Sequence, residues 1–164
     1  MVDSDEIDES ATRFADTAKQ YATAIDNVAE QERSAFLVEI YRLLPKLIDL
    51  AISLPDTEPT DEEPPAREID QQDGWHRLFA RLGERMGERD GYAVVFDPVS
   101  DTEIVRGSLA DDLADIYRDL TGPLNALSMS SANKIWHWRF SFQTHWGNHA
   151  VDALKTIHCL LCYY

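Results

Sequence analysis

Apolar side chains recur at intervals of three and four residues along most of this 164-residue chain, and this spacing is typical of one face of an α-helix. Five segments show the pattern and are predicted to be helices: Glu6–Val28, Glu30–Leu54, 75–88, 108–122 and 132–161. The chain is long enough to bury a substantial core. We therefore expect an all-α, single-domain bundle of about five helices over residues 1–164.

Local signals refine these helices and the segments between them. Pro45 lies inside the second helix and predicts a kink there. Ser108, followed three residues later by Asp111, is a capping-box-like start for the fourth helix. Four prolines and a dense run of acids within 55–72 predict a flexible acidic loop between the second and third helices. Residues 1–6 are expected to be disordered.

The short run Tyr92–Phe96 has the composition of a β-strand. We expect it to be an extended segment packed on the helices, because no partner strand is evident. Aromatic and polar residues alternate within Ile135–Phe142, which leaves open a two-stranded ribbon between these two runs. One long helix over 132–161 is favoured, because no turn residues divide it.

The formal net charge of −15 limits the classes of partner. Such a surface repels phosphate backbones and acidic lipids, so neither nucleic acid nor a membrane is expected as a partner. The acidic start of the chain differs from a signal peptide, and no apolar run is long enough to span a bilayer. Cys159 and Cys162 fall in one helical turn, where we expect them to act as small apolar residues of a cytoplasmic protein. A monomer or weak homodimer is expected.

Three stretches together resemble a known family. They are "AFLVEIYRLLPKLIDLAISLP" at 35–55, "GSLADDLADIYRDL" at 107–120 and "HWGNHAVDALKTIH" at 145–158. They resemble DUF5063, a family of uncharacterised bacterial proteins, and the resemblance covers the chain from about Phe14 onward. It implies a helical fold and supplies no catalytic residues.

The aspartates of the fourth helix are the first candidate site. The letters "DDLAD" match the aspartate-rich box with which isoprenoid synthases hold Mg²⁺ and a diphosphate, but the second box of those enzymes is missing. A different metal-dependent phosphohydrolase would use Asp112, Asp115 and Asp119 as one half of its site and Glu32 or Glu39 as the other. The alternative interpretation is structural, because acidic side chains near the start of a helix are stabilised by the positive end of the helix dipole.

An arginine row is the second candidate site. Arg77, Arg81, Arg85 and Arg89 recur every four residues along the third helix. Guanidinium groups at this spacing can receive a phosphate or carboxylate ligand, and the first three are the candidate anion-binding residues. The plainer interpretation is a solvated face, or a seam of ion pairs with the aspartates of the fourth helix.

The fifth helix supplies the third candidate site. At 100° per residue on a straight helix, Arg139 falls inside the apolar face, His149 falls on its edge, and His145 lies one turn earlier. A buried guanidinium needs an acidic partner, which predicts a pair between Arg139 and Asp112 or Asp119 with His149 beside it. His-x-x-x-His can chelate a metal only with a further ligand.

The resulting prediction is a buried polar network without a metal ion or cofactor, formed by the following residues: Asp112, Asp115, Asp119, Arg139, His145 and His149. An acidic surface with a proline-rich loop suits protein partners, so the favoured function is a protein-interaction module. The alternative is a divalent-metal-dependent phosphohydrolase of the nucleotide pyrophosphatase kind, which would use the aspartate face of the fourth helix.

Overall fold

The computed structural model describes residues 3–61 and 73–164. Its α-helices are α1 (Ser4–Asp26), α2 (Arg33–Ile52), α3 (Gly74–Met86), α4 (Leu109–Asn125), α5 (Ser131–Ser141) and α6 (Gly147–Tyr163). The shorter elements are the 3₁₀ turns η1 (Val28–Glu30) and η3 (Gly87–Arg89), the strands β1 (Gly91–Val94) and β2 (Val105–Ser108), and the π-helical turn η4 (Phe142–Trp146). The fold is mostly α-helical, as predicted, with one small sheet.

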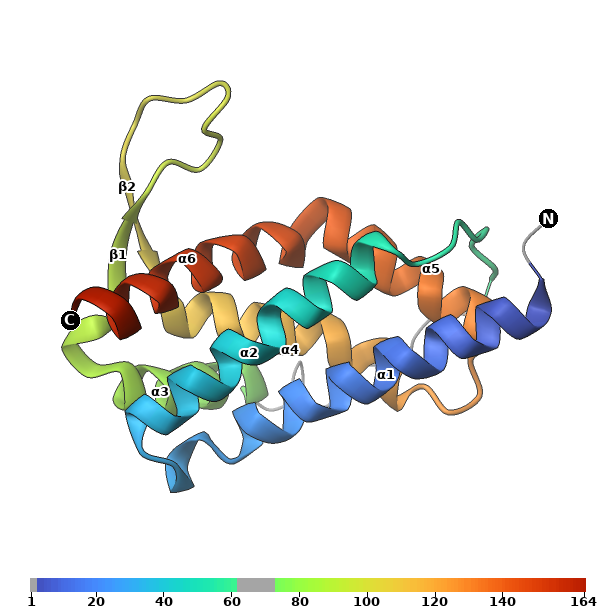
Figure 1. Cartoon of the computed structure of the whole chain (residues 1–164), viewed down its shortest axis with the longest axis horizontal. Helices are drawn as coiled ribbons and strands as arrows, with labels where there is room; N and C mark the ends of the chain where they lie inside the picture. Colours follow the sequence, from blue (N-terminus) through green and yellow to red (C-terminus); the bar gives the residue numbers. More distant parts are fainter. Residues whose placement is uncertain (1–2, 62–72) are drawn as a thin grey trace.

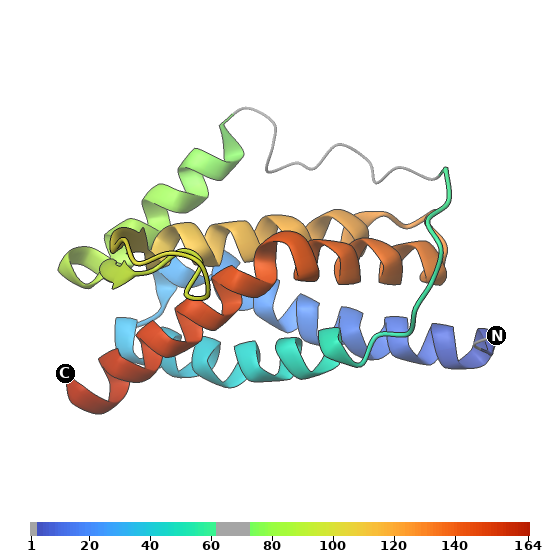
Figure 2. The same cartoon turned by 90° about the horizontal axis from the view of Figure 1, so that it is seen from above.

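Four long helical rods make up the bundle: α1, α2, α4 and the continuous run from α5 through η4 to α6 (Figure 1). Helix α1 packs on α2, α4 and α5, while α6 packs on α2 and α4. Helix α3 leans on the outside of α4, as Figure 2 shows. The largest fully buried side chains are those of Trp138, Trp146, Tyr21, Phe14 and Phe36. Within the described ranges, no helix is both long and apolar enough to cross a membrane.

The first helix begins earlier than its sequence predicts. The side chain of Asp3 accepts a hydrogen bond from the backbone N–H of Asp5 and caps α1, so residues 3–6 form a helix start and the expectation of disorder is wrong for them. Pro45 lies inside α2, which continues to Ile52. Ser108 caps α4 by accepting a hydrogen bond from the N–H of Asp111, as its spacing predicts.

Only the beginning of the predicted acidic loop belongs to the described part of the chain, because 62–72 lie outside the described residues. The Thr57 hydroxyl donates a hydrogen bond of 2.9 Å to the carbonyl oxygen of Ala132. The N–H of Thr60 donates one of 3.2 Å to Oδ1 of Asn133. The chain after α2 is therefore tied to the first turn of α5.

The β-like run is part of a hairpin that was not predicted from the sequence. Strands β1 and β2 are antiparallel, with Tyr92 opposite Gly107 and Val94 opposite Val105. Both expectations for Tyr92–Phe96 are therefore wrong, since it neither packs alone on the helices nor pairs with Ile135–Phe142. Its partner is a stretch of four residues directly before α4, too short to carry a recognisable alternation. The hairpin stands away from the bundle (Figure 1).

The predicted long helix is continuous but contains a π-helical turn, η4. This turn depends on Gly147, because a Cβ atom there would overlap the carbonyl oxygen of Phe142 and lie 3.1 Å from its ring. A π turn holds about one residue more than an α turn, so it rotates α5 relative to α6 by roughly 100° compared with a straight helix. Assigning residues to helix faces at 100° per residue therefore fails for residues on opposite sides of this turn.

The π turn yields a stability prediction with a matched control. We expect Gly147→Ala to lower the free energy of unfolding by about 1–3 kcal/mol, because the new methyl group meets backbone that cannot move away. Gly83 lies inside α3, and nothing comes within 4 Å of the place that an alanine methyl would take, so Gly83→Ala should raise stability by about 0.5–1 kcal/mol. Urea denaturation of both variants tests this, and a neutral Gly147→Ala would contradict it.

Candidate metal centre

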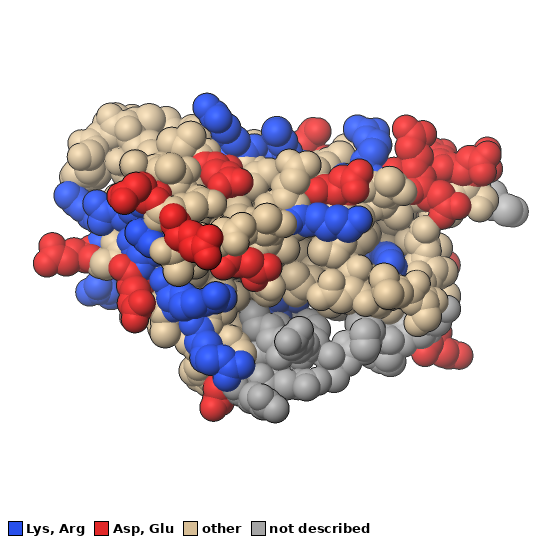
Figure 3. Space-filling model, turned by 90° about the horizontal axis from the view of Figure 1, so that it is seen from below, with Lys and Arg blue, Asp and Glu red and all other residues tan. Residues whose placement is uncertain are grey.

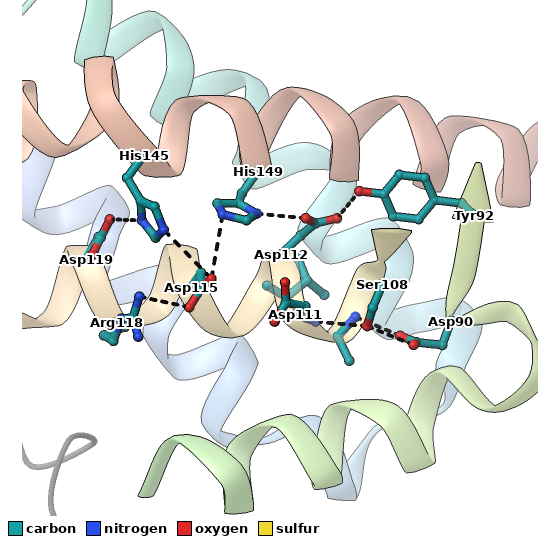
Figure 4. Close-up of polar contacts among 12 residues, drawn as sticks. Asp90, Tyr92, Ser108, Asp111, Asp112, Asp115, Arg118, Asp119, His145 and His149 are labelled. Carbon is teal, nitrogen blue, oxygen red and sulfur yellow. Dashed lines mark hydrogen bonds and ion pairs between the residues drawn. The ribbon is translucent and has the colours of Figure 1, made fainter. Parts of the chain in front are cut away.

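Three aspartates of α4 face two histidines across the interface between α4 and α6 (Figure 4). Asp112, Asp115 and Asp119 are spaced three and four residues apart, which places them on one side of α4. His145 lies in η4 and His149 in the first turn of α6, again four residues apart. The two rods are antiparallel (Figure 1), so the later aspartate meets the earlier histidine.

Each histidine is held by its own carboxylate. Nδ1 of His145 lies 2.7 Å from Oδ2 of Asp119, and Nδ1 of His149 lies 2.8 Å from Oδ1 of Asp112. A carboxylate accepts a hydrogen bond from the ring nitrogen that carries a proton. In a neutral ring this leaves Nε2 as the nitrogen with a free lone pair, which is how metal-binding histidines are usually oriented.

Both Nε2 atoms point to the third carboxylate. Oδ2 of Asp115 lies 3.6 Å from Nε2 of His149 and 3.9 Å from Nε2 of His145. One ligand atom from each of these three residues lies within 4.8 Å of the other two. Ligands of a zinc-sized ion stand roughly 3–3.5 Å apart for bonds of about 2.1 Å. A small inward adjustment would let the three atoms bind one ion.

The remaining oxygen of Asp115 is held from the other side. The indole N–H of Trp75, on α3, donates a hydrogen bond of 3.0 Å to Oδ1, and the Arg118 guanidinium lies 3.1 Å from the same atom. The carboxylate is therefore fixed by one oxygen, while the other, Oδ2, faces the histidines. This division of roles orients Asp115 toward the point where the two Nε2 atoms converge.

Burial and mutual repulsion dominate the electrostatics of the cluster. The pKa values of Asp111, Asp112 and Asp152 are raised above the ordinary range, in each case mainly because burial disfavours the charged form. The charge of Asp115 adds to this effect at Asp111, and the charge of Asp112 adds to it at Asp152. Hydrogen bonds from His149 and Tyr92 to Asp112 oppose the increase in its pKa without cancelling it.

His149 responds in the opposite way. Burial alone would lower its pKa, but its hydrogen bond to Asp112 and the charges of Asp112, Asp115 and Asp111 outweigh that effect and raise it. The centre therefore favours positive charge at this position. Either a proton on His149 or a bound metal ion would offset the negative charge of the surrounding carboxylates.

Arg139 does not belong to this network, which corrects the predicted pair with Asp112 or Asp119. It forms an ion pair with Asp56, in the segment after α2, and its side chain is 32% exposed. The cause is the π turn, which rotates α5 away from the direction that a straight helix would give it. Arg118, three residues after Asp115 on α4, is the arginine that reaches the aspartates.

The arginine row is only partly available for an anion. Nε and Nη2 of Arg85 donate hydrogen bonds of 3.0 and 2.7 Å to the carbonyl oxygens of Val28 and Ala29, so this residue caps the end of the α1–η1 segment. Arg77 and Arg81 are exposed on α3 and remain candidates. Figure 3 shows the basic side chains as a diagonal row over α3.

Other sequence candidates lie outside the cluster. Glu32 is the exposed N-cap residue of α2, and exposed Glu39 accepts a hydrogen bond from Gln31, so neither joins the described contacts of the aspartate face. Cys162 is exposed, which corrects the expectation that it acts as a small apolar residue. Its sulfur lies 3.7 Å from Nδ1 of His158, which also contacts the hydroxyl of Tyr41.

Four residues of the cluster were missed from the sequence: Trp75, Tyr92, Arg118 and Asp152. The spacing of three between Asp115 and Arg118 is a usable signal, because such pairs meet on a helix surface. Trp75 and Tyr92 come from α3 and β1, and no local pattern connects them with α4.

Comparison with known proteins assigns the chain to a family. The model of a domain of unknown function, DUF5063, matches residues 5–163. The chain belongs to the DUF5063 family. The crystal structure of protein BF1032 from Bacteroides fragilis is similar to this DUF5063 chain with a TM-score of 0.81 and 20% sequence identity. The similarity covers 96% of this chain and 95% of that one, and it shows a shared fold. Among curated proteins, no similar sequence was found.

The reassigned arginines of this DUF5063 protein give a second prediction. Arg139→Ala should lower the free energy of unfolding by less than about 1 kcal/mol, because its ion pair with Asp56 is exposed to solvent. Arg85→Ala should cost more, about 1–3 kcal/mol, because two backbone carbonyls lose a charged donor. Urea denaturation measures both, and the reverse order would show that Arg139 is the structural arginine.

Asp152 gives a pH-dependent prediction. Its pKa is raised in the folded state, so the folded state binds more protons than the unfolded state at pH values between the two pKa values. The ionised form therefore costs stability at pH 7, and the cost disappears below the unfolded pKa of about 3.9. Asp152→Asn should raise the thermal midpoint at pH 7 in the metal-free chain, and the gain should vanish near that lower pH.

Asp97 is the matched control for Asp152→Asn. Its carboxylate accepts a hydrogen bond from the N–H of Val99, which lowers its pKa, so the sign of the effect is reversed. Asp97→Asn should therefore not stabilise the chain at pH 7. If both variants gained stability alike, the gain would reflect the overall negative charge and not the environment of Asp152.

Proposed function

We propose that this DUF5063 protein binds one divalent transition-metal ion through Asp115, His145 and His149. The observation that carries the proposal is the convergence of two Nε2 atoms on one carboxylate oxygen, at 3.6 and 3.9 Å, while each Nδ1 is held by a separate carboxylate. No metal was expected from the sequence, because His-x-x-x-His lacked a further ligand. Asp115 supplies that ligand from another helix.

The donor set selects the class of metal. Two imidazole nitrogens and one carboxylate oxygen suit Zn²⁺, Fe²⁺, Mn²⁺ or Co²⁺, whereas Mg²⁺ and Ca²⁺ prefer oxygen ligands alone. The predicted magnesium site on the aspartate face would need Asp112 and Asp119 as ligands. Each of these carboxylates already holds the Nδ1 of a histidine, so their role is to orient the ligands and not to bind the ion.

The number of ligands indicates a reactive centre more than a structural one. Structural zinc sites are closed by four protein ligands, whereas three protein ligands leave a position for water or a substrate. The side chain of His145 is 38% exposed, so the centre can be reached from solvent on that side. An ion of the zinc class held by Asp115, His145 and His149 would supply Lewis acidity, which would lower the pKa of a water molecule toward neutral and make it a nucleophile. Hydrolysis, including that of phosphate esters, is the reaction class we propose.

A protein-interaction role is the second candidate. The loop between β1 and β2 exposes the apolar side chains of Phe96, Val99 and Ile104, with exposed fractions of 81%, 93% and 71%. Isolated apolar side chains on a surface are ordinary, but three on one projecting hairpin favour a contact surface. The two candidates differ in one requirement, since an interaction module needs no metal ion.

Metal titration tests the proposal. Chain stripped with a chelator should take up one Co²⁺ or Zn²⁺ per molecule, with a raised thermal midpoint because the ion binds the native state. His145→Ala, His149→Ala and Asp115→Ala should each weaken binding by at least about tenfold, because each removes a ligand. His76, whose side chain is 77% exposed and which pairs with Asp73, provides the control, and His76→Ala should bind like the unaltered chain.

Bound metal is measured by elemental analysis after dialysis, and the visible spectrum of the Co²⁺ form reports nitrogen coordination. Circular dichroism of each variant separates lost binding from lost folding. Uptake that is equal in the three ligand variants and in His76→Ala would place the ion elsewhere. No uptake by the unaltered, folded chain would reject the metal centre and favour the interaction module.

A further inference from the structure

The hairpin formed by β1 and β2 reaches the candidate centre through Tyr92. The Tyr92 hydroxyl donates a hydrogen bond of 2.6 Å to Oδ2 of Asp112 (Figure 4). The other oxygen of the same carboxylate, Oδ1, lies 2.8 Å from Nδ1 of His149. Asp112 is only 4% exposed. One buried carboxylate therefore joins a residue of the hairpin to a proposed metal ligand.

The position of the Tyr92 ring depends on a glycine in the opposite strand. Tyr92 is paired with Gly107 in the antiparallel ladder. A Cβ atom on Gly107 would lie 2.5 Å from Cζ of Tyr92 and 2.8 Å from its hydroxyl oxygen, closer than atoms of real side chains approach. The ring therefore lies across Gly107, and a larger residue at that position would displace it.

The base of the hairpin is fixed to the helix that carries the aspartates. Oδ1 of Asp90 accepts a hydrogen bond of 2.8 Å from the N–H of Ala110, and Oδ2 accepts one of 2.8 Å from the Ser108 hydroxyl. The carbonyl oxygen of Asp90 accepts another, of 2.9 Å, from the N–H of Leu109. The start of β1 is thus held on the first turn of α4, while the loop beyond the strands projects into solvent.

We infer that Tyr92 is a positioning residue for the metal centre, which fixes the ring of His149 through Asp112 and thereby couples the hairpin to occupation of the site. The inference rests on the proposed function. A carboxylate that holds Nδ1 of a metal-binding histidine sets the direction of its Nε2 lone pair. Without the tyrosine hydroxyl, Oδ2 of Asp112 loses its donor and the carboxylate is no longer held in one orientation. Because coupling is reciprocal, bound metal stabilises the contact of the hairpin with α4.

Two variants remove the contact by different routes. Tyr92→Phe deletes the hydroxyl, and Gly107→Ala displaces the ring while keeping the hydroxyl. Tyr117 provides the matched control, because its hydroxyl donates a hydrogen bond of 3.0 Å to Oδ1 of Asp26, on α1. Tyr117→Phe therefore deletes the same chemical group from another tyrosine–aspartate pair. Circular dichroism verifies that each variant folds.

Competition titration of Co²⁺ against a chelator measures the affinity. Tyr92→Phe and Gly107→Ala should weaken binding by about 10- to 100-fold, the usual effect of losing a partner of a ligating group, and Tyr117→Phe should leave it unchanged. In nitrogen NMR of the metal-free chain, Tyr92→Phe should shift the ring signals of His149 and leave those of His145, which is held by Asp119. In the unaltered chain, bound metal should slow amide exchange in β1 and β2, and Tyr92→Phe should abolish that slowing.

The failure of the coupling is distinguishable from the failure of the metal centre. If the unaltered chain binds one ion and Tyr92→Phe binds as tightly as Tyr117→Phe, the coupling is overturned and the metal centre stands. Equal shifts at His145 and His149 would overturn it as well, because they would indicate a general loosening of the fold. If the unaltered chain binds no metal, both proposals fall together.

Discussion

Three carboxylates lie largely buried between α4 and the run from η4 to α6, and this burial is the constraint on which the polar contacts around them depend. An ionised carboxylate inside a protein is costly unless each oxygen has a donor or a counter-charge. The oxygens of Asp112 and Asp115 are met from four directions, by β1, α3, α4 and α6. The cluster therefore adds polar contacts to two elements at the edge of the bundle, the hairpin and α3, and α3 also buries Leu78, Leu82 and Met86 in the apolar core. The position of the centre therefore depends on how α3 and the hairpin pack on α4.

The helices were predictable because burial of an apolar stripe requires a period near 3.6 residues, and that period is visible in the letters alone. The rotation of α5 relative to α6 was not predictable from that period. A π turn at Phe142–Trp146 leaves the apolar residues on both sides periodic while rotating one half against the other. Gly147 marks the place, but a glycine in a helix has several possible reasons, and the overlap with Phe142 appears only in three dimensions. This single rotation explains why Arg139 was assigned to the buried network and lies instead beside Asp56.

Five of the residues that form the centre were identified from spacing: Asp112, Asp115, Asp119, His145 and His149. Their roles were not, because a role depends on which oxygen meets which nitrogen. Spacing cannot show that Asp112 and Asp119 hold the Nδ1 atoms of the histidines while Asp115 faces their Nε2 atoms. Tyr92 and Trp75 were out of reach for a different reason. Each belongs to an element whose docking on α4 is set by contacts distant in sequence, and β2 is too short for its pairing with β1 to be read from alternation.

The charge of the cluster connects its stability to its proposed role. Asp111, Asp112 and Asp152 all have raised pKa values, so their ionised forms oppose folding, and the raised pKa of His149 shows that a positive charge at the centre is favoured. A chain selected for stability alone would lose some of these carboxylates, because replacing buried charge by apolar packing is often neutral or stabilising. In the proposed centre, retaining them next to two oriented histidines would make the metal-free state less stable than the metal-bound state. A divalent cation at the proposed centre would offset the charges of the neighbouring buried carboxylates, so part of its binding free energy would come from the cost of burying those charges in the metal-free chain.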